Sequence, residues 1–360
     1  MFHFGLKFLL VGGIFLASCC SILFGLLDYS PSGIIFTSLC FVVRVVQGLG
    51  ISSYYIACFT TAAILFTDNY GFVIGLLETS ISLGFLLGPT IGGTLYSFGG
   101  YFAPFALLGG LLFLFCPVIF CVVPSGFVDG NENTKKESPG RVFKVMFKPG
   151  LIVVLYTMLT TTISWVFTET TLGVRLTEFG ITDPMIIGIV YLSSSGAYAI
   201  SAPGAGRIAD KYDLGWLVML IGTILLAAGY LVVGPSPFLF GIIPEGLPQL
   251  VIGCCLTHTG LALVQIPTTR ELQRQAAHYG LDPDDPSTLS FISAVFECTW
   301  GLGGFLGAFL SGILMENFGF PMATTIQSFV VLSCFFLQFY TIFKFSKDNL
   351  TNKRSDYTQI

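Results

Sequence analysis

Long apolar segments follow one another along almost the whole chain, and they limit its fold more than any other feature. A helix needs about 20 apolar residues to cross the hydrocarbon core of a bilayer. Charged residues make up 10% of the 360 residues, against about 25% in soluble domains. The sequence therefore predicts an all-α membrane protein with the lipid bilayer around it and no nucleic-acid partner. Ten spans are expected, at about 6–27, 34–60, 71–96, 101–123, 150–174, 185–205, 215–234, 248–269, 289–314 and 321–343.

A polar stretch at 124–149 divides these spans into four and six. Its Gly, Pro, Lys and Glu content is typical of a solvated linker. The sequence predicts an incomplete N-terminal helical bundle at 1–123, a cytoplasmic linker at 124–149, a six-helix bundle at 150–344 and a cytoplasmic tail at 345–360. Of the 16 Lys and Arg residues, fourteen fall on one side of the predicted membrane. The positive-inside rule makes that side cytoplasmic, and both termini are expected there.

The third and ninth spans repeat one pattern, "ETSISLGFLLGPTIGG" from Glu78 and "ECTWGLGGFLGAFLSG" from Glu297. At a constant spacing of 219 positions, Glu78 matches Glu297, Gly84 matches Gly303, Gly88 matches Gly307 and Gly93 matches Gly312. A second alignment, at a spacing of 210, pairs Gly5 with Gly215 and Gly12 with Gly222. It gives the first span a counterpart, which argues against a cleaved signal peptide.

Parallel repeats of this kind build transporters with two six-helix halves. The first half here has two spans fewer than the second. We therefore expect the chain to begin at the third helix of a twelve-helix plan, either as a truncated isoform or gene model, or because this lineage lost two helices.

Three glutamates, Glu78, Glu169 and Glu297, are expected inside spans. A charge near the bilayer centre costs about 2.5–3.5 kcal/mol on insertion scales, so such residues usually have a partner or a function. Burial disfavours the charged form of a carboxyl group and a nearby cation restores it, so the group can hold either a proton or an amine. With Arg44 the one intramembrane cation, three acids favour a positively charged substrate.

Three motifs stand out, "RVVQG" from Arg44, "GFLLGPTIGG" over Gly84–Gly93 and "GRIADK" over Gly206–Lys211. They resemble motifs of the major facilitator superfamily. The resemblance implies proton coupling for Arg44, whose rival role is a packing pair with a carboxylate, for instance Glu78. Spaced glycines let helices approach closely and proline bends a helix. Gating and helix packing are thus expected of Gly84, Gly88, Pro89, Gly92 and Gly93, and of a loop containing Gly206, Asp210 and Lys211.

Longer stretches, such as "LFGLLDYSP", "FTETTL" and "VQIPT", resemble the vesicular amine transporters and most of all their polyamine branch. That resemblance implies amine recognition by Glu169 and a proton and substrate path at Glu297. His258 is the one ionisable residue well inside its span; it is either a proton relay or a hydrogen-bonded packing residue. Tyr54, Tyr55 and Trp165 are candidates for cation–π contact with an amine.

The predicted function is proton-coupled antiport of an organic cation, a polyamine or monoamine, into acidic vesicles by a monomeric, multi-pass vesicle membrane protein. The alternative is a truncated, transport-incompetent membrane protein that assembles with or regulates an intact relative. No enzyme is expected, since neither a Ser/His/Asp set nor a phosphate loop occurs. No cofactor or metal is expected either, because the ten cysteines fall in apolar runs without metal-ligand spacing.

Overall fold

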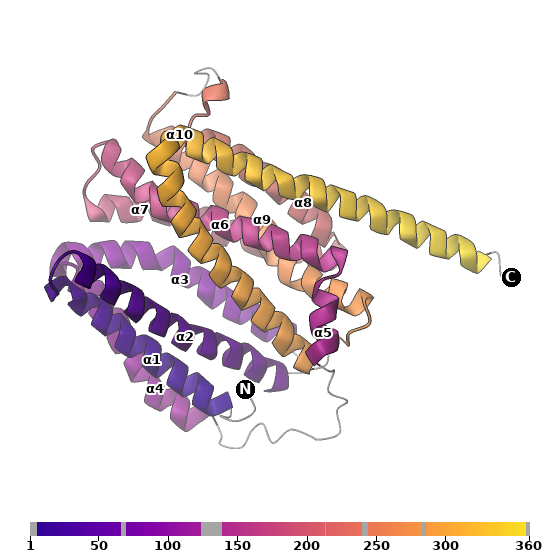
Figure 1. Cartoon of the computed structure of the whole chain (residues 1–360), viewed down its shortest axis with the longest axis horizontal. Helices are drawn as coiled ribbons and strands as arrows, with labels where there is room; N and C mark the ends of the chain where they lie inside the picture. The colour runs from indigo at the N-terminus through magenta and orange to yellow at the C-terminus, as the bar shows by residue number, and fades with distance from the viewer. Residues whose placement is uncertain are drawn as a thin grey trace. The chain divides into compact units, whose positions relative to one another are not determined.

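A computed structural model describes residues 6–65, 70–123, 139–212, 214–239, 244–282 and 286–357. All regular structure in these ranges is helical, as the sequence predicts (Figure 1). Two short 3₁₀ helices, Leu27–Tyr29 and Pro237–Leu239, accompany the α-helices. The α-helices are α1 (Leu6–Leu26), α2 (Ile34–Leu65), α3 (Tyr70–Gly99), α4 (Phe102–Val122), α5 (Pro139–Met146), α6 (Pro149–Glu178), α7 (Pro184–Tyr212), α8 (Gly215–Val233), α9 (Leu247–His278) and α10 (Pro286–Tyr357).

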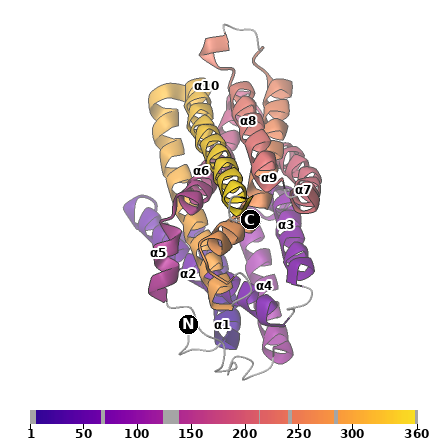
Figure 2. The same ribbon diagram turned by 90° about the vertical axis from the view of Figure 1, so that its right-hand side faces the viewer.

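Helix α10 contains the last two predicted spans. Its 72 residues include one non-helical residue, Gly319, with φ 70° and ψ 169°, and Pro321 follows two residues later. A positive φ suits glycine, and proline cannot continue the hydrogen-bond ladder of a helix. The helix therefore turns back on itself there, which Figures 1 and 2 show plainly. In the described residues, eight helices are long and apolar enough to span a membrane.

One sequence-based expectation needs correction. Gly206–Lys211 is not a loop, because α7 continues as a helix to Tyr212 and Gly206 adopts helical backbone there. Nothing in that segment stops a helix, since its one Gly is tolerated and no Pro follows it. The predicted linker also contains helix α5 at its C-terminal end. Residues 124–138 lie outside the described part of the chain.

By their contacts, the described residues form two compact units. Unit 1 comprises Met1–Lys136, Asp183–Ile189 and Asp284–Glu297; unit 2 comprises Glu137–Thr182, Val190–Pro283 and Cys298–Ile360. In unit 1, α1 packs against both α2 and α4. The Ser18 hydroxyl on α1 donates to the Gly109 carbonyl on α4 over 2.7 Å, which a close approach of these two helices permits.

In unit 2, α8 and α9 run side by side in close contact, and α6 packs on α9 (Figures 1 and 2). Glycine makes the α8–α9 contact possible. A Cβ atom added at Gly260 would lie 2.4 Å from the Leu226 nitrogen, and one added at Gly222 would lie 2.9 Å from the Gly260 carbonyl oxygen. Small residues at helix contacts are typical of membrane proteins, where close backbone packing replaces the hydrophobic effect.

The distribution of polar and apolar side chains is that of a protein surrounded by lipid. Large apolar side chains are exposed, among them Phe98 at 89% and Ile34 at 85%. Several polar side chains of α6, in contrast, are fully buried, among them Thr157, Thr161 and Ser164. The Ser and Thr hydroxyls bond carbonyls one turn earlier in α6, so this helix satisfies its own polar groups. Of the functional candidates in unit 2, Glu169 lies on this helix and His258 of α9 is itself buried.

Candidate functional site

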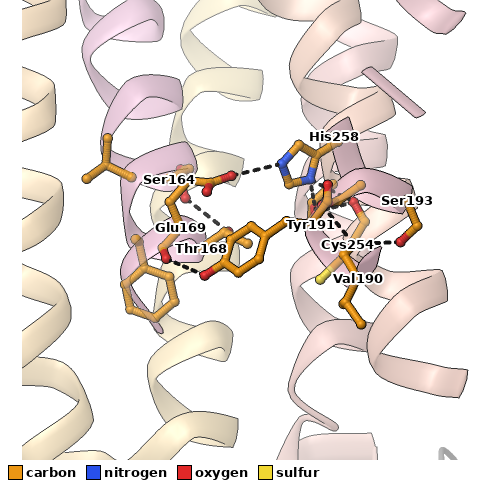
Figure 3. Close-up of polar contacts among 12 residues, drawn as sticks. Ser164, Thr168, Glu169, Val190, Tyr191, Ser193, Cys254 and His258 are labelled. Carbon is orange, nitrogen blue, oxygen red and sulfur yellow. Dashed lines mark hydrogen bonds and ion pairs between the residues drawn. The ribbon is translucent and has the colours of Figure 1, made fainter. Parts of the chain in front are cut away.

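An acidic and a basic side chain face each other inside unit 2 (Figure 3). Glu169 of α6 has a side chain that is 29% exposed, and His258 of α9 has one that is 4% exposed. The Glu169 Oε1 and His258 Nε2 atoms are 3.6 Å apart, which is ion-pair distance but too long for a hydrogen bond. The structure thus brings together two residues that the sequence singled out separately.

The His258 ring is oriented by its own helix. Its Nδ1 atom lies 2.9 Å from the carbonyl oxygen of Cys254, one turn earlier on α9. Because a carbonyl oxygen only accepts hydrogen bonds, Nδ1 must carry the hydrogen. The Nε2 atom is buried and has no hydrogen-bond partner among the described residues. A neutral His258 therefore presents a bare lone pair towards Glu169.

Tyrosine side chains from two other helices, Tyr191 (labelled in Figure 3) and Tyr230, fix α6 around Glu169. The Tyr191 hydroxyl of α7 donates to the Glu169 main-chain carbonyl over 2.7 Å. The Tyr230 hydroxyl of α8 donates to the Ser164 carbonyl and lies 2.7 Å from the Thr168 hydroxyl. These contacts hold the backbone that carries the acid and leave its carboxylate available to other groups.

Helix α10 completes the surroundings. The Gln327 amide nitrogen donates to the Ser164 hydroxyl over 2.6 Å. One turn before Glu169 on α6, the Trp165 ring lies 5.0 Å from the ring of Trp300, with 39° between the planes. The indole pair places aromatic faces on the same stretch of α6 as the carboxylate, where they could contact a bound cation.

The arrangement can bind either a proton or an organic cation. A carboxylate forms strong charge-assisted hydrogen bonds with an ammonium group. Histidine is the side chain that changes charge between about pH 5 and 8 in its unperturbed form. Among the residues that the structure describes, no group of three His, Cys, Asp or Glu side chains is placed to hold a metal ion.

Arg44 lies on α2 in unit 1. Its Nη1 atom donates to the Gln47 Oε1 atom over 2.9 Å, and the guanidinium carbon lies 3.8 Å from the centre of the Phe24 ring. An aromatic ring and an amide oxygen thus accompany the charge. The Glu78 side chain lies outside the described residues, so a pair between it and Arg44 stays a prediction.

Other predicted residues are placed less completely. Glu297 is half-buried on α10, in unit 1. The side chains of Pro89, Asp210 and Lys211 lie outside the described residues. Among described atoms, nothing lies within 4 Å of a Cβ added at Gly84, Gly88 or Gly92, whereas one at Gly93 would lie 2.6 Å from the Pro184 carbonyl oxygen. Their gating roles stay predictions, as does that of Gly206.

The aromatic candidates fall in different units. In unit 1, Tyr54 and Tyr55 line a pocket together with Cys58, Phe59, Leu77, Ser80 and Ile81. Trp165 lies in unit 2, near Glu169. Sequence reasoning missed Tyr191, Cys254 and Gln327. Gln327 had a detectable signal, an amide inside an apolar span; Cys254 contributes through its main chain and had none.

Comparison with known proteins gives consistent matches. Residues 3–280 match the family model described as Major Facilitator Superfamily. The MFS-type transporter SLC18B1 of Rattus norvegicus is 32% identical over 326 residues, which cover 90% of this chain and 70% of that protein. The corresponding protein of Homo sapiens is 31% identical over an alignment of 367 residues, which covers 99% of this chain and 78% of that protein.

More distant matches agree. The Chromaffin granule amine transporter of Rattus norvegicus is 25% identical over 309 residues, which cover 84% of this chain and 56% of that protein. Among solved structures, the Major Facilitator Superfamily transporter FucP in its outward conformation gives a TM-score of 0.58 at 13% identity, over 94% of this chain and 84% of that one. This last match concerns the fold alone. The resemblance to vesicular amine transporters that the sequence motifs indicate is confirmed.

Proposed function

Because the chain belongs to the major facilitator superfamily and is therefore a transporter rather than an enzyme, we propose that it exchanges protons for a small organic cation. The cation is a polyamine or a monoamine, moved from the cytoplasm into acidic vesicles by alternating access. The observation that supports this proposal is the partly exposed Glu169 carboxylate facing the buried His258 ring. The Glu169 carboxylate is suited to bind an ammonium ion, and the His258 ring is suited to bind a proton.

The remaining parts of the proposal rest on sequence. Arg44, Glu78 and Glu297 are assigned to coupling and to the proton and substrate path, by resemblance and by the cost of charges in lipid. Both termini are assigned to the cytoplasm by the distribution of Lys and Arg. The division into a 1–123 bundle, a 124–149 linker, a 150–344 bundle and a tail, and the monomeric state, belong to the same proposal.

Uptake into liposomes with an acidic interior tests the proposal. The purified chain should accumulate radiolabelled spermidine or serotonin, and collapse of the pH gradient should stop accumulation. Glu169→Gln should reduce uptake at least about tenfold, since removing one partner of a charged contact costs about 2–5 kcal/mol. Glu316→Gln, a substitution of the same kind at an exposed position of α10, should leave uptake unchanged.

Two outcomes would contradict the proposal. One is uptake that continues at the same rate after the gradient has been collapsed, because the exchange would then not be coupled to protons. The other is the absence of uptake of either cation by correctly folded protein. Normal uptake by Glu169→Gln would be compatible with proton-coupled transport but would show that another residue binds the cation.

A further inference from the structure

We infer that Glu169 and His258 act as a dyad that holds a single exchangeable proton, which a bound cation displaces. The inference rests on the proposed function and adds to it a proton count and a location. It follows from three observations: the hydrogen bond that fixes the His258 ring, the unpartnered Nε2 atom, and the burial of His258. Each restricts the charge states that the pair can adopt.

The first restriction comes from the Cys254 carbonyl oxygen, which lies 2.9 Å from His258 Nδ1 and accepts its hydrogen. The Thr257 hydroxyl, 3.5 Å from the same nitrogen, is too far away to compete. In the neutral ring, the second nitrogen is therefore an acceptor. An ionised Glu169 also only accepts, so a pair without an added proton would direct two acceptors at each other.

The second restriction comes from burial. With two added protons the pair would carry a positive charge, and His258 is 4% exposed. A buried charge without a partner is costly. One added proton gives zero net charge, either as imidazolium with carboxylate or as carboxylic acid with neutral imidazole. In both forms the hydrogen lies between Nε2 and Oε1, and each acceptor is satisfied once the gap of 3.6 Å closes slightly.

The other titratable groups near the pair are neutral at physiological pH in their ordinary forms. They are Tyr191 on α7, Tyr230 on α8 and Cys254 on α9. Helix α10 contributes Gln327 and Trp300, which do not titrate. Of the residues that the structure describes, His258 is the one basic side chain within ion-pair distance of Glu169. The balance of charge is therefore set by the dyad itself.

An arriving ammonium group donates its N–H hydrogens to the Glu169 carboxylate and adds one positive charge. Zero net charge returns when His258 Nε2 or Glu169 gives up the added proton to water. No covalent bond other than this N–H or O–H bond breaks. The Glu169 side chain is 29% exposed and that of His258 is 4% exposed, so we expect the cation to contact Glu169 first.

Titration calorimetry tests the inference. Binding of spermidine or serotonin, whichever the wild type binds, is measured near neutral pH in buffers of different ionisation enthalpy, which counts the protons released. The wild type should release one more proton per cation than His258→Gln, whose amide can keep the bond to the Cys254 carbonyl. His278→Gln, on the exposed end of the same helix, should match the wild type.

A second measurement needs no variant, so a folding defect in His258→Gln cannot obscure the result. In the wild type, the base-10 logarithm of the cation dissociation constant should fall by one for each unit that the pH rises. This slope applies over the pH range in which the free dyad holds its proton, after any titration of the cation itself has been subtracted. A slope of two, or equal proton counts for the wild type and His258→Gln, would overturn the dyad. Gradient-driven uptake would still stand in that case, so the two failures are distinguishable.

Discussion

Gly84 and Gly88 of α3 and Gly303 and Gly307 of α10 hold equivalent positions in the repeat, yet their surroundings differ. Among described atoms, a Cβ added at Gly84 or Gly88 meets nothing within 4 Å. One added at Gly303 would lie 2.8 Å from Thr162 Cβ, and one at Gly307 would lie 2.8 Å from the Ile163 carbonyl oxygen. Gly303 and Gly307 thus lie at a helix contact with α6 in unit 2. Among the described atoms of unit 1, Gly84 and Gly88 have no such neighbour, and the close contact of that stripe is at Gly93, where an added Cβ would lie 2.6 Å from the Pro184 carbonyl oxygen.

A second pair of equivalent sites, the glycine crossings of α1 with α2 and of α8 with α9, has similar contacts in both units. In unit 1, Gly13 of α1 and Gly50 of α2 each approach the other's carbonyl oxygen, with added Cβ atoms at 2.6 and 2.8 Å. In unit 2, Gly222 of α8 and Gly260 of α9 do the same, at 2.9 and 2.8 Å. Close crossings between neighbouring helices are therefore common to the two halves. What distinguishes them is the polar interior around α6 in unit 2.

Gly260→Ala should give the largest loss of stability. Its Cβ would lie 2.4 Å from the Leu226 main-chain nitrogen, and a backbone atom cannot rotate away. Overpacking costs about 1–3 kcal/mol and occasionally more. Thermal unfolding of the detergent-solubilised protein should show a smaller shift for Gly50→Ala, whose closest contact is 2.8 Å. Equal shifts of the unfolding midpoint would mean that the α8–α9 and α1–α2 crossings adjust equally well to an added methyl group.

The control for Gly260→Ala is Gly304→Ala on α10, where nothing described lies within 4 Å of the added Cβ. Alanine is the better helix former by about 1 kcal/mol, so this variant should be neutral or slightly more stable. Destabilisation by Gly304→Ala would indicate that the glycine effects do not come from local contacts.

Gly307→Ala against Gly88→Ala tests the glycine stripe directly. An added Cβ at Gly307 meets the Ile163 carbonyl oxygen at 2.8 Å and Val166 Cβ at 3.0 Å, so α6 and α10 must separate. We expect a lower unfolding midpoint for Gly307→Ala, by an intermediate amount, and no loss for Gly88→Ala. A loss of stability in Gly88→Ala would show that the repeat-equivalent glycine packs against a helix in unit 1 after all.

Much of the fold could be predicted from the sequence because apolar run length determines the spans. The end of α7 could not, since a helix can extend past the apolar run until a breaking residue stops it. The alignment of α1 with α8 did not identify which glycine of α1 lies at the crossing with α2. It matched Gly12 with Gly222, but Gly13 makes the contact and Gly12 has nothing described within 4 Å. Gly12 and Gly13 are adjacent and fit the sequence pattern equally well. Only the direction in which a Cβ would point determines which of them faces the neighbouring helix.

The candidate site was predictable as a set of residues but not as an arrangement. An acid in one span and a histidine in another are each visible because charge and imidazole are rare in lipid. Their pairing depends on how α6 and α9 are rotated about their axes, which the periodicity of a largely apolar helix leaves undetermined. The tautomer of His258 depends on a main-chain oxygen, which every residue possesses and no motif marks.

The smallest expected effect compares the polar interiors of the two units. Ser164→Ala would remove the acceptor of the Gln327 amide, which is 3% exposed, and leave that donor unpaired. Ser18→Ala would remove only a donor to the Gly109 carbonyl, which has a second hydrogen bond within α4. A buried unpaired group costs about 1–3 kcal/mol, although polar contacts in membrane proteins average about 0.6 kcal/mol.

Ser164→Ala should therefore lower the unfolding midpoint more than Ser18→Ala. The matched control is Ser53→Ala, because the Ser53 hydroxyl only donates to the Leu49 carbonyl of its own helix. A Gln327→Leu substitution in the Ser164→Ala background should recover part of the loss, because the unpaired amide is then gone. No recovery would mean that the cost comes from packing around Ser164. The polar interior of unit 2 would in that case position Glu169 without contributing through its hydrogen bonds to stability.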